Sequence, residues 1–546
     1  MSNYNSPLEA FLYWEANTPD CILFEQPING EIIEFSYVRV GQEARKIAAH
    51  LQSYDLPKGS HIAILSKNCA HWLIADLAIM MAGYVSVPIY ASLNPHTIHQ
   101  VLVHSDSKVV IVGKLDDFEY QISGVRNIDV ISIDVYGDSH GVLWGDIVAS
   151  AMPLKEIHQW QPEDVMTIVY TSGTTGEPKG VMHTFGNLMT SIDITINAIK
   201  LPNNLHLFSY LPLANLAERL IASAAVVVGA KIFFITSKET FVNDIVHCQP
   251  KVLLSVPMVW MKLQDHILEN MSQIKLNILL NIPFLKEVFR RKIKAKLGLN
   301  STFFIFTATA PMPISLTNWY RKLGIDIFQG YGTTEDCCIS HFNLPDNHKI
   351  GTVGKPLDNV QVKLSPEGEI LVKNTCLMKG YYKDPEMTAS AFTEDGYFKT
   401  GDIGEYDSEG YLTIIGRIKD QFKTDKGKYI FPESLELELL KNIDIKRVCV
   451  VGSGAPAPIA LIILSEQGKM KARDMLILSI EESLNKMKPL FETYEHIAKV
   501  VIMKEDWNIE NGLTTPTLKL KRNSIERINR PYYKNWSNTP YDIIFE

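Results

Sequence analysis

The sequence YTSGTTGEPKGVMHT, at residues 170–184, constrains the fold of this chain more than any other stretch. It follows an apolar run at residues 165–169 that predicts a buried strand, and a second strand is expected from Gly180 onward. Between the two, glycines allow backbone N–H groups to turn toward an anion, and hydroxyl side chains add further donors. Lys179 contributes a positive charge. The pattern therefore predicts a strand–loop–strand unit that binds polyphosphate.

This loop differs from the common nucleotide loop GxxxxGK[ST], in which lysine directly follows the second glycine and a helix begins. Here Glu177 and Pro178 follow Gly176 and no helix is expected, so a helix N-terminus does not hold the phosphate. The unit resembles instead the phosphate loop of adenylate-forming enzymes, the superfamily of acyl-CoA synthetases, firefly luciferase and peptide-synthetase adenylation domains. A Gly/Ser/Thr-rich surface turn is the alternative. The resemblance implies that phosphate is bound by Thr171, Ser172, Gly173, Thr174, Thr175, Gly176 and Lys179.

Length and composition predict at least two domains. The 546 residues are 46% hydrophobic, enough to bury large cores, and the net charge of −8 argues against nucleic acid as a partner. The seven cysteines show no CxxC or metal-ligand spacing, so a reducing compartment is expected and structural zinc is not. No signal peptide is visible, and the most apolar tracts, residues 77–91 and 220–230, are too short to span a membrane. We expect a cytoplasmic protein, with peripheral contact at the inner face of the membrane left open.

Helix and strand patterns alternate through the first part of the chain. Ser6 followed by Pro7 predicts a helix start, and Asn29 with Gly30 predicts a tight hairpin between two strands. Further elements are an apolar helix at residues 72–81 and strands at residues 61–65, 85–88 and 108–112. This rhythm recurs after the phosphate loop and predicts a large N-terminal α/β domain with mostly parallel sheets.

Two later segments resemble elements that border the acyl site of long-chain fatty acyl-CoA synthetases. They are SYLPLANLAERL at residues 209–220, which by itself predicts an amphipathic helix, and VPMVW at residues 256–260. Long-chain enzymes usually carry His where this chain has Asn215, which leaves details of acyl binding open but not the reaction. The resemblance implies an acyl pocket lined by Leu213, Asn215, Val256 and Pro257.

The segments TATAP (307–311) and QGYGTTE (329–335) each follow an expected strand, at residues 303–306 and 325–328. Small side chains in the first let a flat ring approach the backbone. In the second, Tyr331 offers a π-face, Thr334 a hydroxyl and Glu335 a hard oxygen ligand for Mg²⁺. A Gly-bracketed turn with a surface glutamate is the alternative. The resemblance implies an adenine, α-phosphate and magnesium site formed by Ala310, Pro311, Gly330, Tyr331, Gly332, Thr334 and Glu335.

Two further segments resemble the ribose-binding and hinge elements of the superfamily: DGYFKTGD at residues 395–402 and GRIKD at residues 416–420. The resemblance implies that Asp402, in a tight TGD turn, accepts both ribose hydroxyls, that Arg417 contacts the ribose, and that Lys419 is a hinge. A charged hairpin is the alternative for the second segment. The expected domains are an N-terminal adenylation domain, residues 1–417, and a small mobile C-terminal α+β domain, residues 418–546.

The C-terminal part carries two more resemblances. The loop with Lys426, Gly427 and Lys428 is similar to the one that approaches the CoA pantetheine, although relatives often have two glycines in place of Lys426 and Gly427. The sequence GLTTPTLKLKR at residues 512–522 resembles the C-terminal lysine motif of fatty acyl-CoA synthetases, which implies that Lys519 is the catalytic lysine. A solvated basic run is the alternative, and the order of the preceding motifs argues against it.

The resemblance, which covers essentially the whole chain, implies a two-step reaction with ATP, Mg²⁺ and coenzyme A. A carboxylate attacks the α-phosphorus of MgATP to give acyl-AMP and pyrophosphate, and the CoA thiol then displaces AMP. A carboxylic acid with a pKa of about 4.3 is already ionised at neutral pH, so no general base is needed. The transition state instead requires neutralised phosphate charge, and the implied catalytic residues are Thr174, Lys179, Glu335 and Lys519.

The sequence leaves alternatives open. The acyl-AMP could load a carrier-protein phosphopantetheine, the acid could be non-fatty, and a nucleotide-binding scaffold without catalysis is a remote alternative. The chain length of the acid and a homodimer are not decided. A basic, partly apolar stretch at residues 286–296 can lie on an anionic bilayer, although such runs are usually only a solvated face; its cations are Lys286, Arg290, Arg291, Lys292, Lys294 and Lys296.

Overall fold

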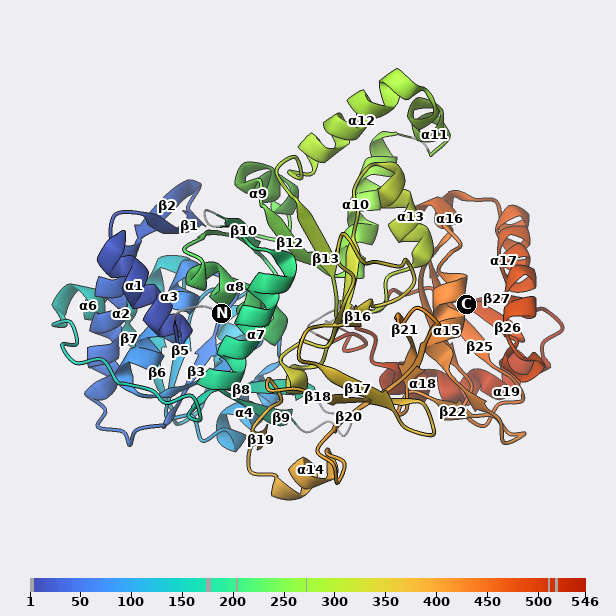
Figure 1. The fold of residues 1–546 in the computed structure, drawn as a ribbon. Coiled ribbons are helices and arrows are strands. Elements are labelled where there is room, and N and C mark those ends of the chain that lie inside the picture. Colours follow the sequence, from blue (N-terminus) through green and yellow to red (C-terminus); the bar gives the residue numbers. More distant parts are fainter. Residues whose placement is uncertain (1–3, 173–177, 203–204, 272, 509–510, 516–518) are drawn as a thin grey trace.

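Two large sheets and a smaller C-terminal domain make up the chain, as the computed structural model shows (Figure 1). The structure describes residues 4–546 except for residues 173–177, 203–204, 272, 509–510 and 516–518. An α/β fold with a large N-terminal domain of mostly parallel sheets and a small C-terminal domain is thereby confirmed.

The first sheet has eight strands in the order β19-β9-β8-β4-β3-β5-β6-β7. Its strands from β8 to β7 run parallel, whereas β9 and β19 are antiparallel to their neighbours. Strands buried on both faces need continuous apolar runs, such as VVIV in β5. The strands are β3 (His61–Leu65), β4 (Val85–Ile89), β5 (Val109–Val112), β6 (Asp129–Ser132), β7 (Val142–Leu143), β8 (Val165–Ser172), β9 (Pro178–Thr184) and β19 (Gly380–Tyr381).

The second sheet has nine strands in the order β16-β15-β14-β13-β12-β10-β11-β1-β2. The strands from β14 to β1 run parallel, and antiparallel strands complete both edges. The strands are β1 (Ile22–Ile28), β2 (Glu31–Ser36), β10 (His206–Ser209), β11 (Lys231–Phe234), β12 (Val252–Ser255), β13 (Phe304–Thr307), β14 (Phe328–Tyr331), β15 (His341–Phe342) and β16 (Lys355–Pro356).

Helix α3 (Ala70–Ala82) contacts β3 and β4 of the first sheet and β1 of the second. All of its residues are buried, as expected for a helix that is apolar on nearly every side. It shares the main core with α8 (Leu216–Val227). The remaining helices of the large domain are α1 (Pro7–Asn17), α2 (Tyr37–Gln52), α4 (Pro95–His104), α5 (Phe118–Ile122), α6 (Trp144–Ser150), α7 (Phe185–Ile199), α9 (Phe241–Cys248), α10 (Pro257–Asn270), α11 (Gln273–Asn281), α12 (Pro283–Lys296), α13 (Ile314–Lys322) and α14 (Pro385–Ser390).

A smaller antiparallel sheet precedes the C-terminal domain. Its strands follow the order β17 (Gln361–Leu364), β18 (Glu369–Lys373), β20 (Phe398–Tyr406) and β21 (Leu412–Arg417). After β21 the chain turns into a short hairpin of β22 (Phe422–Lys423) and β23 (Tyr429–Ile430).

The C-terminal domain is built on a mixed four-stranded sheet with apolar clusters on both faces. Val448 and Val450 of its first strand belong to one cluster, and Cys449 and Val451 to the other, as strand alternation requires. The strands are β24 (Ile445–Val451), β25 (Ile459–Leu464), β26 (Lys499–Ile502) and β27 (Ile543–Phe545). The helices are α15 (Pro432–Leu439), α16 (Glu466–Met470), α17 (Arg473–Met487), α18 (Arg522–Asn529) and α19 (Tyr533–Asn538).

Local predictions are mostly confirmed. The Ser6 hydroxyl caps α1 by accepting from the backbone N–H of Glu9, and Asn29 and Gly30 turn between β1 and β2 with φ angles of 50° and 87°. The strand expected at residues 325–328 is displaced, because β14 begins only at Phe328. Within the described part of the chain, no helix combines the length and the apolar character needed to cross a membrane.

Candidate active site

The predicted acyl and nucleotide segments follow neighbouring strands of the nine-stranded sheet. Strands β10, β12, β13 and β14 are parallel neighbours, so their carboxyl ends lie on the same side of the sheet, which we call its carboxyl end. Ligands of open α/β sheets bind outside such carboxyl ends. The predicted residues at or after these strand ends are Leu213, Asn215, Val256, Pro257, Ala310, Pro311, Gly330, Tyr331, Gly332 and Thr334.

Asp402 is the centre of a polar cluster at this carboxyl end of the sheet. Its Oδ2 accepts a hydrogen bond from the Tyr331 hydroxyl at 2.7 Å, and its Oδ1 lies 2.8 Å from Nε of Arg417. The carboxylate is buried, and Asp402 stands opposite Arg417 in the pairing of β20 with β21. Because each carboxylate oxygen carries two lone pairs, both can still accept from a pair of ribose hydroxyls.

The backbone at Asp402 differs from the expected tight turn. Asp402 lies inside β20, one position after Gly401, whose φ of 73° bends the strand locally. The Asp402 charge raises the pKa of Arg417, while burial and then Asp402 raise the pKa of Tyr331. Arg417 therefore stays charged and the Tyr331 phenol stays protonated at neutral pH.

Glu335 lies close to the strand that follows the predicted phosphate loop, through a hydrogen bond to a neighbouring strand. It lies in a 3₁₀ turn, Thr334–Asp336, and its Oε1 accepts from the Tyr381 hydroxyl at 2.9 Å. Tyr381 belongs to β19, which pairs with β9, and the Lys179 ammonium of β9 lies 5.7 Å from the centroid of the Tyr381 ring. The fold thus gathers a carboxylate, a phenol and a cation from three distant segments.

The position of Glu335 suits a Mg²⁺ ion that is bound together with the phosphates of a nucleotide. Among the residues that the structure describes, no group of three or more His, Cys, Asp and Glu side chains could enclose a metal ion. Magnesium in nucleotide enzymes is usually bound by one or two carboxylates together with substrate phosphates. The Glu335 carboxylate lies next to the Lys179 strand, which is a suitable position for such a ligand.

The two ends of the phosphate loop are held side by side. Strands β8 and β9 remain paired as far as Thr171 with Lys179 and Ser172 with Pro178. The strand–loop–strand prediction is therefore confirmed for its two strands. The predicted residues Gly173, Thr174, Thr175 and Gly176 lie outside the described residues, as does the side chain of Ser172.

Lys519 of the small domain lies within electrostatic range of Arg417 and Asp402. The Thr515 N–H donates to the Lys519 carbonyl at 2.7 Å, and the Lys519 N–H donates to Thr515 Oγ1 at 3.0 Å. Burial lowers the pKa of Lys519, as does the nearby Arg417 guanidinium, while Glu433 and Asp402 oppose the shift. The structure therefore brings together the predicted lysine and the predicted ribose residues, which belong to different domains.

The predicted hinge and CoA-facing residues lie in turns. Lys419 lies in the turn between β21 and β22, where the Asp420 N–H donates to the Arg417 carbonyl at 3.1 Å. Gly427, with a φ of 77°, turns the hairpin between β22 and β23, and Lys426 and Lys428 beside it are exposed. These positions suit a hinge and an accessible loop.

Buried polar groups support the acyl segment. The Asn68 side chain accepts from the Leu213 N–H at 3.0 Å and donates to Ser209 Oγ at 2.9 Å. Ser209 in turn donates to Oε1 of Glu218 at 2.8 Å. Burial raises the pKa of Glu218 to about 8, so its carboxyl is mostly protonated at neutral pH. Asn215 caps α8 by accepting from the Ala217 N–H at 2.9 Å.

Sequence reasoning missed a second buried network. Arg219 donates through Nη2 to both carboxylate oxygens of Asp76, at 2.7 and 2.8 Å, and through Nη1 to Thr167 Oγ1 at 2.6 Å. Thr167 lies in β8, so Arg219 ties the acyl segment to the strand before the phosphate loop. The available signal was a charged residue within each of two apolar helices, since buried charges are usually paired.

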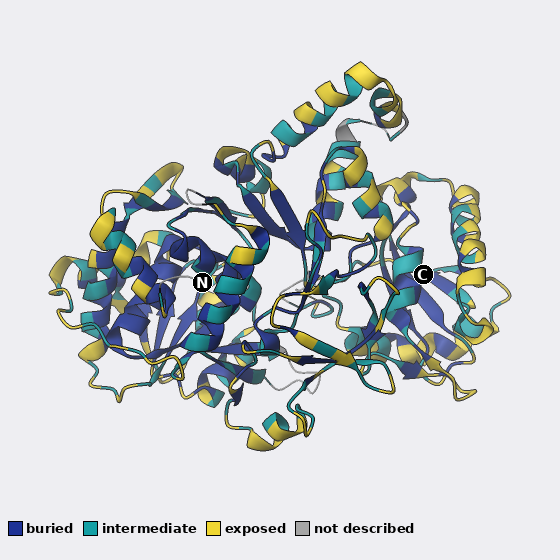
Figure 2. Ribbon diagram, in the orientation of Figure 1, coloured by how far each residue is buried: buried dark blue, intermediate teal, exposed yellow. Residues whose placement is uncertain are grey.

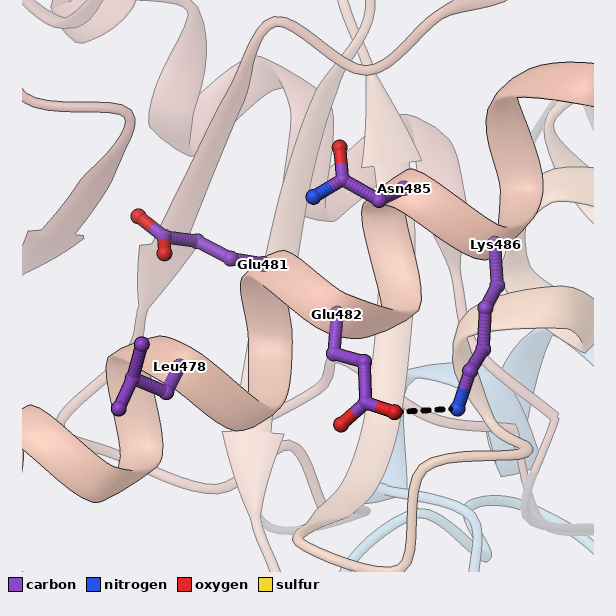
Figure 3. A pocket seen from close by; sticks show the side chains of 5 residues that line it. All are labelled: Leu478, Glu481, Glu482, Asn485 and Lys486. Carbon is purple, nitrogen blue, oxygen red and sulfur yellow. Dashed lines mark hydrogen bonds and ion pairs between the residues drawn. The ribbon is translucent and has the colours of Figure 1, made fainter.

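A hollow of about 520 Å³ lies over the outer face of α17 (Figure 3). Its lining includes the ion pair between Lys486 and Glu482, at 2.7 Å, whose side chains are largely exposed. None of its lining residues belongs to the predicted site, and we assign it no role in the chemistry.

Comparisons with known proteins agree with this geometry. Long-chain-fatty-acid–CoA ligase FadD15 of Mycobacterium bovis is 28% identical over 563 residues, covering 93% of this chain and 93% of its own length. Fatty acyl-CoA synthetase A of Dictyostelium discoideum is 29% identical, covering 90% of this chain and 84% of its own length. The adenylation domain of a carboxylate reductase from Mycobacterium chelonae has the same fold, with a TM-score of 0.81 at 19% identity over 97% of this chain and 91% of that one.

Family models match nearly the whole chain. The model described as AMP-binding enzyme matches residues 12–382, and the model described as AMP-binding enzyme C-terminal domain matches residues 419–527. The first model alone spans well over half of the 546 residues. This protein belongs to the AMP-binding enzyme family.

Proposed function

We propose that this protein is an AMP-forming ligase that joins a long-chain fatty acid to coenzyme A. The named activities of the relatives from M. bovis and D. discoideum support this substrate class. The observation that carries the proposal is the approach of Lys519, from the small domain, to the Asp402–Arg417 pair of the large domain. A scaffold that only binds a nucleotide has no need of a lysine delivered to the nucleotide residues by a separate domain.

In the first step the fatty carboxylate attacks the α-phosphorus of ATP, and pyrophosphate leaves. Asp402 and Arg417 hold the ribose, and the small residues at Ala310 and Pro311 leave room for adenine beside Tyr331. Glu335 would hold Mg²⁺ together with the phosphates, and the bound ion would supply neutralisation of charge on the phosphate oxygens. Removal of one pre-aimed charge costs about 3 kcal/mol, or roughly 10²–10³ in rate. The proposed phosphate donors are Thr171, Ser172, Thr174, Thr175, Lys179 and Lys519, and Gly173 and Gly176 are expected to give backbone access.

In the second step the CoA sulfur attacks the acyl carbonyl, a C–S bond forms, and the C–O bond to AMP breaks. The small domain, residues 418–546, rotates about Lys419 relative to residues 1–417, which withdraws Lys519 and brings in the loop at Lys426, Gly427 and Lys428. The position of Lys419 in the turn that joins the two domains supports this step.

The acyl chain enters beside Leu213, Asn215, Val256 and Pro257. These residues follow neighbouring parallel strands and lie at the same carboxyl end of the sheet as the predicted nucleotide residues, which supports this pocket. Because a long-chain acid partitions into bilayers, peripheral contact with the inner face of a membrane is part of the proposal. A homodimer stays a prediction, which sedimentation of the purified protein can decide.

The test is carboxylate-dependent exchange of pyrophosphate into ATP, followed by thioester formation, across acids from acetate to oleate and simple aryl acids. We expect exchange and CoA thioester with long-chain acids. Exchange without thioester, together with acyl transfer to a carrier-protein phosphopantetheine, would replace CoA as the acceptor. If no acid supports exchange while the nucleotide still binds, the protein is a scaffold and the proposal is wrong.

A further inference from the structure

Helices α11 and α12 form a hairpin that projects from the large domain beyond α9, α10 and α13 (Figure 1). Four apolar side chains near the junction of the two helices are exposed: Ile278 by 57%, Ile282 by 42%, Phe284 by 81%, and Val288 by 38%. We call these four residues the apolar tip. Single exposed apolar residues are common on protein surfaces, but a cluster of them at the end of a projection indicates a surface that contacts another protein or a membrane.

Cations lie along α12, beginning between two residues of the apolar tip. They are Lys286, Arg290, Arg291, Lys292, Lys294 and Lys296, which we call the basic stretch. Glu287, the acid of α12, is already paired with Arg290 at 2.9 Å. The whole chain has a net charge of −8, so this local excess of positive charge is opposite in sign to the rest of the molecule.

The inner side of the hairpin is fixed to the domain. Arg290 donates through Nε to the Lys322 carbonyl of α13 at 3.0 Å, and the Trp319 indole N–H donates to Gln273 Oε1 at 2.8 Å. Leu276 of α11 and Ile293 of α12 are buried, whereas the outer faces of the hairpin are largely exposed (Figure 2). The apolar tip is therefore held in an exposed position by packing on the opposite side.

We propose that the α11–α12 hairpin docks on an anionic phospholipid bilayer. The apolar tip enters the interface between headgroups and acyl chains, and the exposed cations of the basic stretch, Arg291, Lys292 and Lys296, bind the anionic headgroups. Charge complementarity favours a bilayer, because lysine and arginine reach headgroups with their cations while their alkyl parts lie along apolar surface. The inference rests on the proposed function, since a fatty acid substrate dissolved in the membrane gives the docking its use.

Co-sedimentation with vesicles tests the proposal without any activity readout, so its failure is separate from failure of the proposed function. The full-length protein is mixed with vesicles of phosphatidylcholine alone or of phosphatidylcholine with phosphatidylglycerol. We expect binding to the anionic vesicles that falls with added salt. Phe284→Asp should weaken binding about tenfold or more, and Arg291→Gln with Lys292→Gln about fivefold for each charge removed.

Matched controls come from surfaces far from the hairpin. Met152, which is 79% exposed, is replaced in Met152→Asp, and two exposed lysines, one in α17 and one directly after it, are replaced in Lys486→Gln with Lys488→Gln. These variants should bind vesicles as the parent does. Thermal unfolding of each variant is compared with that of the parent, because only equally stable variants are scored, and Phe284→Ala substitutes for Phe284→Asp if the latter unfolds early.

Three results would overturn the proposal. One is equal binding to neutral and anionic vesicles, and another is equal loss in the hairpin variants and the matched controls. The third is a change in oligomeric state on Phe284→Asp without a change in vesicle binding, which would make a second copy of the chain the occupant of the hairpin.

Discussion

Glu218→Gln should remove a pH-dependent loss of stability that the wild-type protein carries. Glu218 is 2% exposed, and burial raises its pKa from the usual 4.5 to about 8. Between these two values the folded state holds a proton that the unfolded state has released. The unfolded state then binds fewer protons, so the free energy of unfolding falls as pH rises through this window.

The size of the effect follows from the difference in pKa. Each pH unit in the window costs about 1.4 kcal/mol, so between pH 5 and pH 8 the wild type loses roughly 4 kcal/mol through this group alone. Glutamine has the same shape, still accepts from Ser209 and carries no ionisable proton. The stability of Glu218→Gln relative to wild type should therefore rise by a similar amount over the same interval.

Urea unfolding at pH 5, 6, 7 and 8 measures this difference. A matched control is Glu481→Gln on the exposed face of α17, for which the difference from wild type should stay nearly constant with pH. If the Glu218→Gln difference is flat between pH 5 and 8, the buried carboxyl is ionised in the folded protein. The polar network that supports the acyl segment would then hold a charge, and the reasoning from burial would be refuted.

Three predictions concern catalysis. Lys519→Ala should lower pyrophosphate exchange about 10²–10³-fold while thioester formation from supplied acyl-AMP survives, and equal loss in both half-reactions would contradict the role of Lys519. Lys419→Pro should leave exchange intact and block thioester formation, because proline fixes φ at the hinge; two unaffected half-reactions would remove the hinge from this position. Tyr331→Phe deletes the hydroxyl that donates to Asp402 at 2.7 Å, so the KM for ATP should rise about tenfold, measured by exchange at varied ATP, and an unchanged KM would show that Asp402 needs no such support.

Local sequence patterns predicted those parts of the site that depend on neighbouring residues. The strands β8 and β9 were evident from apolar runs around a glycine-rich loop, and the Asn29–Gly30 turn from residues that tolerate positive φ. The displaced strand β14 shows where local patterns are not enough to predict the bounds of a strand. Residues 325–328 have a strand-like apolar pattern, but the ladder is set by pairing of Phe328 with Phe306 and of Gly330 with Phe342, which lie on other strands.

Contacts between distant segments could not be predicted. Nothing local to Tyr381 indicates that its hydroxyl meets Glu335, 46 positions earlier, or that its ring lies beside Lys179. Arg219 and Asp76 stand 143 positions apart, and only the tertiary fold, which places α8 and α3 in the same core, makes them partners. The resemblance to adenylate-forming enzymes supplied the residues of the nucleotide site, but not these supports.

The environment of Lys519 links the proposed chemistry to the proposed domain rotation. Its ammonium is partly removed from water and lies near the Arg417 guanidinium, and both effects lower its pKa and disfavour its charged form. The phosphates of bound ATP would offset this cost by attraction, since opposite charges interact strongly where water is excluded. Once pyrophosphate has left, much of that attraction is gone, while the desolvation of the lysine and its repulsion from Arg417 remain. In the proposed mechanism, release of pyrophosphate would therefore favour return of Lys519 to water, which is the direction of the rotation proposed for the second step.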